Sequence, residues 1–310
     1  MKKKKIALVL FSGGLDSRLA AKMIEEQGFE IHLAFVKLPF GGDNQEKILE
    51  MINFCESQKY QFHIIDSTKG ENFLEYIKLI RKPKHGIGAA MNPCKDCKIF
   101  IFKKGKKLAE VIGASVIVTG EVIGQRPMSQ MKKALLFDEE KAGLSGKILR
   151  PLSAKVLPET NYEKEGIIDR EKLLGIEGRR REIQMSLAEK YKIKYPSPGG
   201  GCLLCDKDYG KKLKALFEYN KNPTYEEIIL VKARMFKDKG LLFLGRNKEE
   251  NVLFKIAGEK LEWNIFFITD LPGPTIVYDK KEDETLARDL WRVYSKKGLE
   301  EREKFEKFKI

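Results

Sequence analysis

The sequence predicts an α/β protein with a doubly wound, mostly parallel sheet, followed by a smaller, β-rich α+β domain. The first two hundred residues alternate continuous apolar runs with segments of helical spacing, as expected for a parallel sheet covered on both faces. A glycine-rich turn joins the first apolar run to the first helical segment. After about residue 220 short apolar runs alternate with turn residues, so we expect domains at 1–215 and 216–310.

In the first domain, strands and helices are expected to follow one another along the chain. The apolar runs expected as strands are 6–11, 29–38, 61–67 and 114–121. The segments with helical spacing are 15–28, 44–60 and 97–113. From 128 to 200 we expect loops and one long helix over 169–193, interrupted at Gly178.

The second domain is expected to consist mainly of strands. They are placed at 227–236, 240–247, 251–257, 263–273 and 274–279. A last amphipathic helix is expected from about Glu282 to Phe308, because apolar residues recur there at helical spacing among charged ones.

Composition favours a protein that binds polyanions. Lysine and arginine number 59 against 45 acidic residues, a formal charge of +14, which attracts nucleic acid. Ten basic residues and a single acid lie in 78–107, so this segment predicts a nucleic-acid contact, with a merely solvated face as the alternative. The sequence has no apolar run of about 18 residues and no signal-peptide pattern, so we expect a cytoplasmic protein without a membrane segment.

The segment FSGGLDS at 11–17 stands where the first strand turns into the first helix, and such a turn offers backbone N–H groups to phosphate. It lacks the spacing and the lysine of the kinase-type loop. Its S-G-G-x-D-S pattern resembles the loop of PP-loop ATP pyrophosphatases, which split ATP into AMP and pyrophosphate. The two hydroxyls and the loop amides would hold pyrophosphate and the aspartate would hold Mg2+; a Gly-Gly turn is the alternative. The residues are Ser12, Gly13, Gly14, Asp16 and Ser17.

Phe35 and Val36 end the second expected strand. In this type of fold that position offers backbone to adenine, so both are candidates for ATP binding. Core packing is the alternative for both.

A second segment extends the resemblance. TGEVIGQRPMSQ at 119–130 resembles the T-G-E-x-x-G-Q-x-x-S-Q segment of the tRNA 4-thiouridine synthases, and residues 92–121 have the layout of tRNA thiolation enzymes that include the 2-thiouridylases. Together with residues 148–160 and 196–206, they make the chain similar to a branch of these enzymes that lacks a rhodanese domain. The resemblance implies a nucleotide or uridine pocket at the carboxyl ends of the strands. Its candidate residues are Thr119, Gly120, Gln125, Arg126, Ser129 and Gln130.

The implied reaction is ATP-dependent thiolation of tRNA. ATP would first adenylate a uracil carbonyl oxygen, and sulfur would then attack the carbon and expel AMP. Sulfide or a cysteine desulfurase would supply the sulfur. The alternatives are an adenylating ligase or amidotransferase for a small molecule, and an RNA-binding protein with a structural zinc. The sequence leaves open which uridine and which carbon is modified, and the oligomeric state, a homodimer included.

Two C-x-x-C pairs carry the remaining chemistry, and Cys55 is expected in the core. Cys94, Cys97 and Cys202 match the three-cysteine pattern of cluster-dependent thiolases, which implies an iron-sulfur cluster of the 4Fe-4S type. A zinc site that adds Cys205 is the second possibility, and a redox pair that carries a persulfide is the third. We favour the cluster because no rhodanese domain is present to deliver a persulfide and because three glycines precede Cys202.

The second domain resembles the small RNA-binding module of ribosome-associated quality-control factors, through LLFLGRNKEENVLFKIA and TDLPGPTIV. The resemblance implies that Arg246, Asn247 and Asn251 contact RNA. A hairpin turn formed by the same residues is the alternative.

Overall fold

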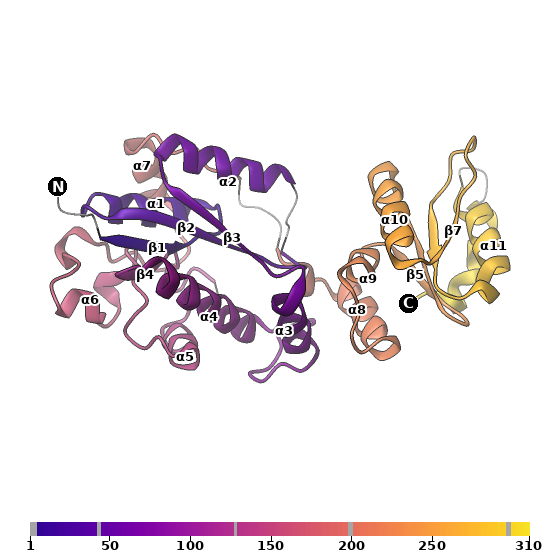
Figure 1. The fold of residues 1–310 in the computed structure, drawn as a ribbon, viewed down its shortest axis with the longest axis horizontal. Helices are drawn as coiled ribbons and strands as arrows, with labels where there is room; N and C mark the ends of the chain where they lie inside the picture. Colours follow the sequence, from indigo (N-terminus) through magenta and orange to yellow (C-terminus); the bar gives the residue numbers. More distant parts are fainter. Residues whose placement is uncertain (1–4, 42–44, 127–128, 198–200, 296–298) are drawn as a thin grey trace. The chain divides into compact units, whose positions relative to one another are not determined.

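Two structural units, Met1–Cys202 and Leu203–Ile310, make up the chain in the computed structural model (Figure 1). The structure describes residues 5–41, 45–126, 129–197, 201–295 and 299–310. The expected boundary after residue 215 falls inside helix α8 (Lys207–Tyr219), which belongs to the second unit. In the described ranges, no helix has both the length and the apolar composition needed to cross a bilayer.

The first unit contains a four-stranded parallel sheet with strand order β3-β2-β1-β4. The strands are β1 (Ile6–Leu10), β2 (Glu30–Lys37), β3 (Gln61–Asp66) and β4 (Val116–Thr119). Each lies within a run expected as a strand, so the prediction of a parallel α/β sheet is confirmed. In the register Leu10 pairs with both Ala34 and Thr119, which brings the carboxyl ends of β1, β2 and β4 to one edge.

Helices cover both faces of this sheet (Figure 1). They are α1 (Leu15–Glu25), α2 (Gln45–Gln58), α3 (Gly70–Arg81), α4 (Cys94–Ile112), α5 (Lys132–Ala142), α6 (Asn161–Lys164) and α7 (Glu182–Lys190). Successive strand residues serve opposite faces: Val9 packs with the α1 side of the core, and Leu8 with the α4 side.

The prediction of a long helix over 169–193 is wrong. The structure has a single 3-10 turn at Arg170–Lys172 and helix α7 from Glu182. Between them the chain is extended, and the backbone amides of Leu174 and Ile176 donate to Pro151 and Leu152. These long-range hydrogen bonds replace the helical ones. Helix α5 lies where loops were expected, and α3 has no counterpart among the expected elements.

The second unit contains a four-stranded antiparallel sheet with strand order β5-β6-β8-β7, which confirms the smaller α+β domain. Its strands are β5 (Arg234–Lys237), β6 (Leu241–Leu244), β7 (Asn264–Phe266) and β8 (Ile276–Tyr278). Its longer helices are α8, α9 (Tyr225–Leu230), α10 (Lys248–Leu261) and α11 (Glu284–Tyr294). Phe236, Leu244 and Leu290 belong to its core.

One expected strand of this unit is helical, and another begins as a helix and ends in strand β5. Residues 251–257 lie inside α10, whose N-cap is Asn247, and Phe254, Ala257 and Gly258 are its buried residues. That 3-to-4-residue spacing is helical, and the run is too short to separate from a strand by composition. Residues 227–230 belong to α9, which begins at a Thr224–Glu227 capping box. The expected last helix ends at Tyr294, and a 3-10 segment spans Leu299–Phe308.

Gly120 sets how closely the end of β4 approaches the start of α1. A Cβ at Gly120 would stand 2.4 Å from the Ser17 nitrogen and 2.5 Å from the Asp16 carbonyl carbon. Both are backbone atoms, so the contact is relieved only by moving the strand end or the helix.

We therefore expect Gly120→Ala to lower the free energy of unfolding by about 1–3 kcal/mol. Urea denaturation of the two proteins measures the change. Gly201→Ala is the matched control, because no atom lies within 4 Å of a Cβ at Gly201. Equal unfolding midpoints for Gly120→Ala and the unsubstituted chain would contradict the close packing.

Candidate nucleotide and cysteine site

The loop between β1 and α1 leaves the amino end of α1 open. Gly14 is the N-cap of this helix and no side chain caps it, so the amides of the first turn keep their hydrogen-bonding capacity. Gly13 has φ +79, and a Cβ there would stand 2.9 Å from the Met51 side chain. A glycine is required at this position, and the resulting turn points backbone donors at an incoming anion.

Two hydroxyls flank the loop. The Ser17 hydroxyl donates to the Gly14 carbonyl at 2.9 Å and lies 3.3 Å from the Ser12 oxygen. The Gly14 amide donates to the Ser12 hydroxyl at 3.4 Å. Ser12 is exposed and Ser17 is buried, so one hydroxyl faces solvent while the other holds the loop.

Asp16 and Gln125 are brought together as neighbouring site residues. The Gln125 side-chain amide donates to Asp16 Oδ2 at 3.0 Å, although the two residues are 109 positions apart. The other carboxylate oxygen of Asp16 is buried and accepts no hydrogen bond from any described residue. A buried carboxylate oxygen in that state fits a hard cation such as Mg2+.

The other residues expected to contact the nucleotide differ in their exposure and in their protein partners. Phe35 and Val36 are 6% and 8% exposed, and Phe35 belongs to the core, so their side chains pack in the protein. The Thr119 hydroxyl is engaged by Glu121 at 3.2 Å. Arg126 is exposed at the sheet edge. Contact of these residues with ATP stays a prediction.

Ser129 and Gln130 take part in the loop itself. The Ser129 carbonyl accepts from Lys98 at 2.6 Å, and the Gln130 carbonyl accepts from the Gly124 amide at 2.8 Å. The segment between Arg126 and Ser129 lies outside the described residues.

The first cysteine pair opens helix α4 instead of preceding it, because Cys94 is its first residue. Cys94 is exposed and Cys97 is half-buried. The Cys97 sulfur lies 3.2 Å from the hydroxyl of the fully buried Tyr76, and the Asn92 amide donates to the Cys94 sulfur at 3.4 Å. Both sulfurs thus have a polar neighbour that sequence reasoning missed.

Cys202 is exposed and contributes to the electrostatics of Cys97. Burial is the main cause that raises the pKa of the Cys97 thiol to about 12; the Tyr76 hydrogen bond opposes it, and Cys202 and Cys94 act in the same direction as burial. A raised pKa keeps the free Cys97 thiol protonated, so a metal or cluster held by these cysteines would have to displace that proton. In the described part of the chain, no three His, Cys, Asp or Glu side chains already form a group that could hold a metal ion. Cys205 belongs to the second unit.

Asp96, inside the C-x-x-C pair, holds the preceding loop onto α4. Its oxygens accept from the His85 amide at 2.9 Å and the Lys84 amide at 3.3 Å, and one oxygen lies 2.9 Å from His85 Nδ1. Asp96 is 5% exposed. The buried carboxylate therefore acts in positioning the turn that carries both cysteines.

A buried ionic network joins α4 to the loop after β4. Lys98 lies 2.8 Å from Glu121 and 3.4 Å from Asp138, and Arg150 pairs with Glu121 at 3.0 Å and with Glu139. Burial favours the neutral form of Glu121, but Arg150 and Lys98 outweigh it and lower its pKa. The sequence did not reveal this network, because its members come from four separate segments.

The basic segment 78–107 is only partly a free surface. Lys104 is 8% exposed, pairs with Glu75 at 2.6 Å and lies 4.9 Å from the centre of the Phe100 ring. Lys106 donates to the Gly143 carbonyl at 3.4 Å. Lys103 and Lys107 are exposed. Lys104 is therefore better explained as a packing residue than as an RNA contact.

The candidate RNA contacts of the second unit have roles in its fold. Asn247 caps α10 by accepting from the Glu250 amide, and Arg246 pairs with Glu250 at 2.6 Å. Asn251 donates to the Gly273 carbonyl and accepts from the Thr275 amide. They join a strand to a helix, so the hairpin alternative is wrong. The RNA-binding role of this unit stays a prediction.

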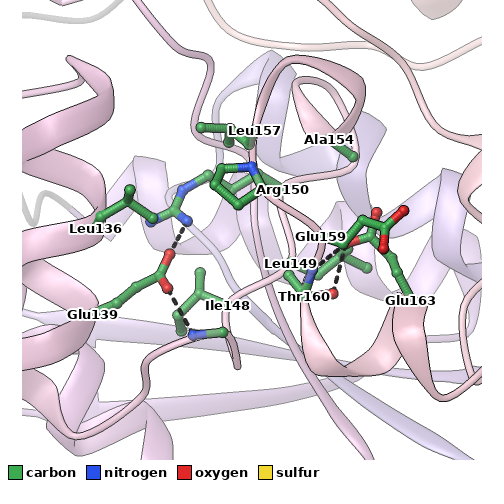
Figure 2. Close-up of a pocket in the computed structure, with 12 residues that line it drawn as sticks. Leu136, Glu139, Ile148, Leu149, Arg150, Ala154, Leu157, Glu159, Thr160 and Glu163 are labelled. Atoms are coloured by element: carbon green, nitrogen blue, oxygen red, sulfur yellow. Dashed lines mark hydrogen bonds and ion pairs between the residues drawn. The ribbon is translucent and has the colours of Figure 1, made fainter.

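A cavity of about 110 Å³ lies elsewhere in the first unit. Figure 2 shows Arg150 reaching Glu139 on one side and Thr160 beside Glu163 on the other. The lining residues include neither the loop at 12–17 nor a cysteine. Its carboxylates are engaged by the ionic network and by a capping box, so the cavity is not the site of the chemistry.

Residues 3–182 match the family described as "Thiamine biosynthesis protein (ThiI)". A tRNA-specific 2-thiouridylase MnmA from Campylobacter hominis is 31% identical over 118 residues, 36% of this chain and 31% of that protein. A probable tRNA sulfurtransferase from Methanocaldococcus jannaschii is 29% identical over 147 residues, 47% of this chain and 36% of that protein. The chain thus matches about a third of the length of these relatives.

Among solved structures, the U34-tRNA thiolase NcsA from Methanococcus maripaludis with its 4Fe-4S cluster is 17% identical. The match covers 74% of this chain and 71% of that one, with a TM-score of 0.37.

Asp138 gives the ionic network a pH dependence. Burial raises its pKa from 3.8 to about 6, against the opposing effect of Lys98. Between these two values the folded chain keeps a proton that the unfolded chain has lost. Stability due to this group therefore falls as the pH rises through that window.

Asp138→Asn removes this titration. We expect the stability of the variant relative to the unsubstituted chain to rise by about 2–3 kcal/mol from pH 4 to pH 7. Urea denaturation at several pH values measures the difference. Glu140→Gln, on the exposed side of the same helix, is the control and should show no such trend. Parallel curves for Asp138→Asn would refute the raised pKa.

Proposed function

This chain belongs to the ThiI family, and from that premise we propose that it uses ATP to transfer sulfur to a uridine of tRNA. The observation that carries the proposal is the contact between Asp16 and Gln125. It joins the S-G-G-x-D-S loop to the T-G-E-x-x-G-Q segment at one edge of the sheet. Both segments lie inside the matched residues 3–182.

The first step is adenylation of a uracil carbonyl oxygen. The open amino end of α1 and the Ser12 hydroxyl would bind the pyrophosphate part of ATP, and Asp16 would hold Mg2+ through its unpartnered oxygen. The α-phosphorus then bonds to the uracil oxygen and pyrophosphate leaves. Gln125 keeps the Asp16 carboxylate oriented in this step.

The second step replaces the oxygen with sulfur. A sulfur nucleophile attacks the activated carbon, and AMP leaves with the former carbonyl oxygen. Sulfide is the proposed source. A persulfide from a cysteine desulfurase would serve if a second cysteine thiol bonded to the inner sulfur as a disulfide and so released the outer sulfur to the uridine.

Cys94, Cys97 and Cys202 would hold a 4Fe-4S cluster through three irons. Such a cluster leaves its fourth iron available to bind sulfide. The proposal is supported by the three-cysteine pattern of the sequence and by the polar neighbours of Cys94 and Cys97. Zinc bound with Cys205, or a cysteine pair that carries persulfide, remain the alternatives for these residues.

Mass spectrometry of tRNA nucleosides tests the function directly. A strain that lacks the chain should lose one thiolated uridine, and the restored gene should return it. An unchanged set of thiolated nucleosides would overturn the proposal.

Asp16→Asn should reduce tRNA-dependent AMP formation by at least a hundredfold, because the neutral amide binds Mg2+ poorly. The released AMP is measured by chromatography. Asp169→Asn, an exposed carboxylate at a distant turn, is the control for the loss of one negative charge. Undiminished AMP formation by Asp16→Asn would exclude the adenylation step.

The chain reconstituted anaerobically with iron and sulfide should be brown, with visible thiolate-to-iron absorption. Replacing Cys94, Cys97 or Cys202 with alanine should each remove the colour while ATP binding persists, and Cys205→Ala should be milder. A colourless protein with one bound zinc, equally dependent on Cys205, would favour the zinc alternative.

A further inference from the structure

Three consecutive arginines, Arg179, Arg180 and Arg181, precede helix α7 and have no role in the proposed chemistry. Arg179 and Arg180 are exposed and Arg181 is half-buried. The acids Glu177 and Glu182 flank the triplet in sequence. Within the described residues, however, no carboxylate pairs with any of the three guanidinium groups.

The triplet lies beside the nucleotide site. The Gly178 amide donates to the Ile123 carbonyl at 2.8 Å, and Ile123 bridges Glu177 as in a parallel ladder. Gly124 packs against Gly178, since a Cβ at Gly124 would stand 3.3 Å from the Gly178 nitrogen. Two residues after Ile123, Gln125 contacts Asp16. Few contacts therefore separate the triplet from the carboxylate proposed to bind Mg2+.

The first turn of α7 also carries side-chain polar groups that have no partner among the described residues. Arg181 is its N-cap and provides no side-chain cap. In the same turn Gln184 is fully buried, and neither polar atom of its amide has a partner among the described residues. The Nε of Arg181 is also buried and has no hydrogen-bond partner among the described residues. Buried donors of this kind are normally satisfied in the functional state.

Together, these observations describe a site for phosphate. A helix amino end attracts anions, and guanidinium groups match phosphate oxygens in a bidentate arrangement. Two of the three side chains are exposed, which favours a large ligand that lies on the surface over a small enclosed one.

We infer that Arg179, Arg180 and Arg181 bind backbone phosphates of the RNA substrate next to the target nucleotide. The inference rests on the proposed function, since it takes tRNA as the substrate. A uridine that reaches the ATP site brings its flanking phosphates to the same sheet edge. The triplet binds these phosphates and orients the strand for adenylation.

The test measures binding of an unmodified tRNA transcript by the full chain over a range of salt concentrations. Arg179→Ala/Arg180→Ala should weaken binding and lower the slope of log K against log salt by about 1 for each arginine. ATP affinity, measured in the same preparations, should not change. Arg179→Lys/Arg180→Lys should restore most of the slope, because the positive charges are kept.

The matched control is Lys147→Ala/Lys164→Ala, which removes the same charge. Both lysines are exposed. Lys147 lies two residues before Leu149, which bridges Val118 in parallel, and α6 contacts Gly146 through the Asn161 amide. These positions are at the opposite, amino-terminal edge of the sheet, so this variant should keep the salt slope.

Three results would overturn the inference. They are an unchanged slope in the arginine variant, an equal loss in the lysine control, and a loss of ATP affinity with RNA binding intact. The last result would mean that the phosphates are those of ATP. An unsubstituted chain that does not bind tRNA would overturn the proposed function as well, which separates the two failures.

Discussion

The candidate nucleotide site depends on the hydrogen bonds of the buried Arg18 guanidinium. Its Nε donates to the Gly13 carbonyl at 2.8 Å, and its Nη1 donates to the Lys194 carbonyl at 2.7 Å. Arg18 is 2% exposed, and a charge so buried is tolerated only when its donors are satisfied. The same side chain therefore fixes the turn proposed to receive pyrophosphate and holds the backbone at Lys194, 176 residues further along the chain.

A second buried ionic contact positions the first cysteine pair, Cys94 and Cys97. Lys98 follows Cys97 on α4, and its ammonium contacts Glu121 and the Ser129 carbonyl on the loop after β4. That loop carries Gln125 to Asp16. The first turn of α4 and the edge of the sheet are thus linked through charges that cannot be separated without leaving one of them buried and unpaired. The two chemical parts of the site are positioned by long-range polar contacts, while apolar packing supplies the sheet beneath them.

These long-range contacts mark the limit of what could be predicted from the sequence. The strands of the first unit and the turn at 11–17 follow from local patterns, because a buried parallel strand is continuously apolar and a phosphate-binding turn needs glycine. Residues 251–257 were mistaken for a strand since a short apolar run has no distinct period until its neighbours are known. The helix expected over 169–193 failed because Leu174 and Ile176 bond to a distant segment. The partners of Arg18 and Lys98 could not be predicted either, because they are distant in sequence.

The charged residues show most clearly what could not be predicted from the sequence. The run of lysines at 78–107 suggested a surface for RNA, yet the buried Lys104 pairs with the exposed Glu75, and Lys98 pairs with Glu121 inside the protein. A count of basic residues cannot separate lysines that pair with carboxylates of the protein from arginines that face solvent beside the proposed site. That distinction depends on which carboxylates the fold brings near. The useful measure of an anion-binding surface is therefore its charge without a protein partner, and in the first unit such charge occurs at the sheet edge where Asp16 lies.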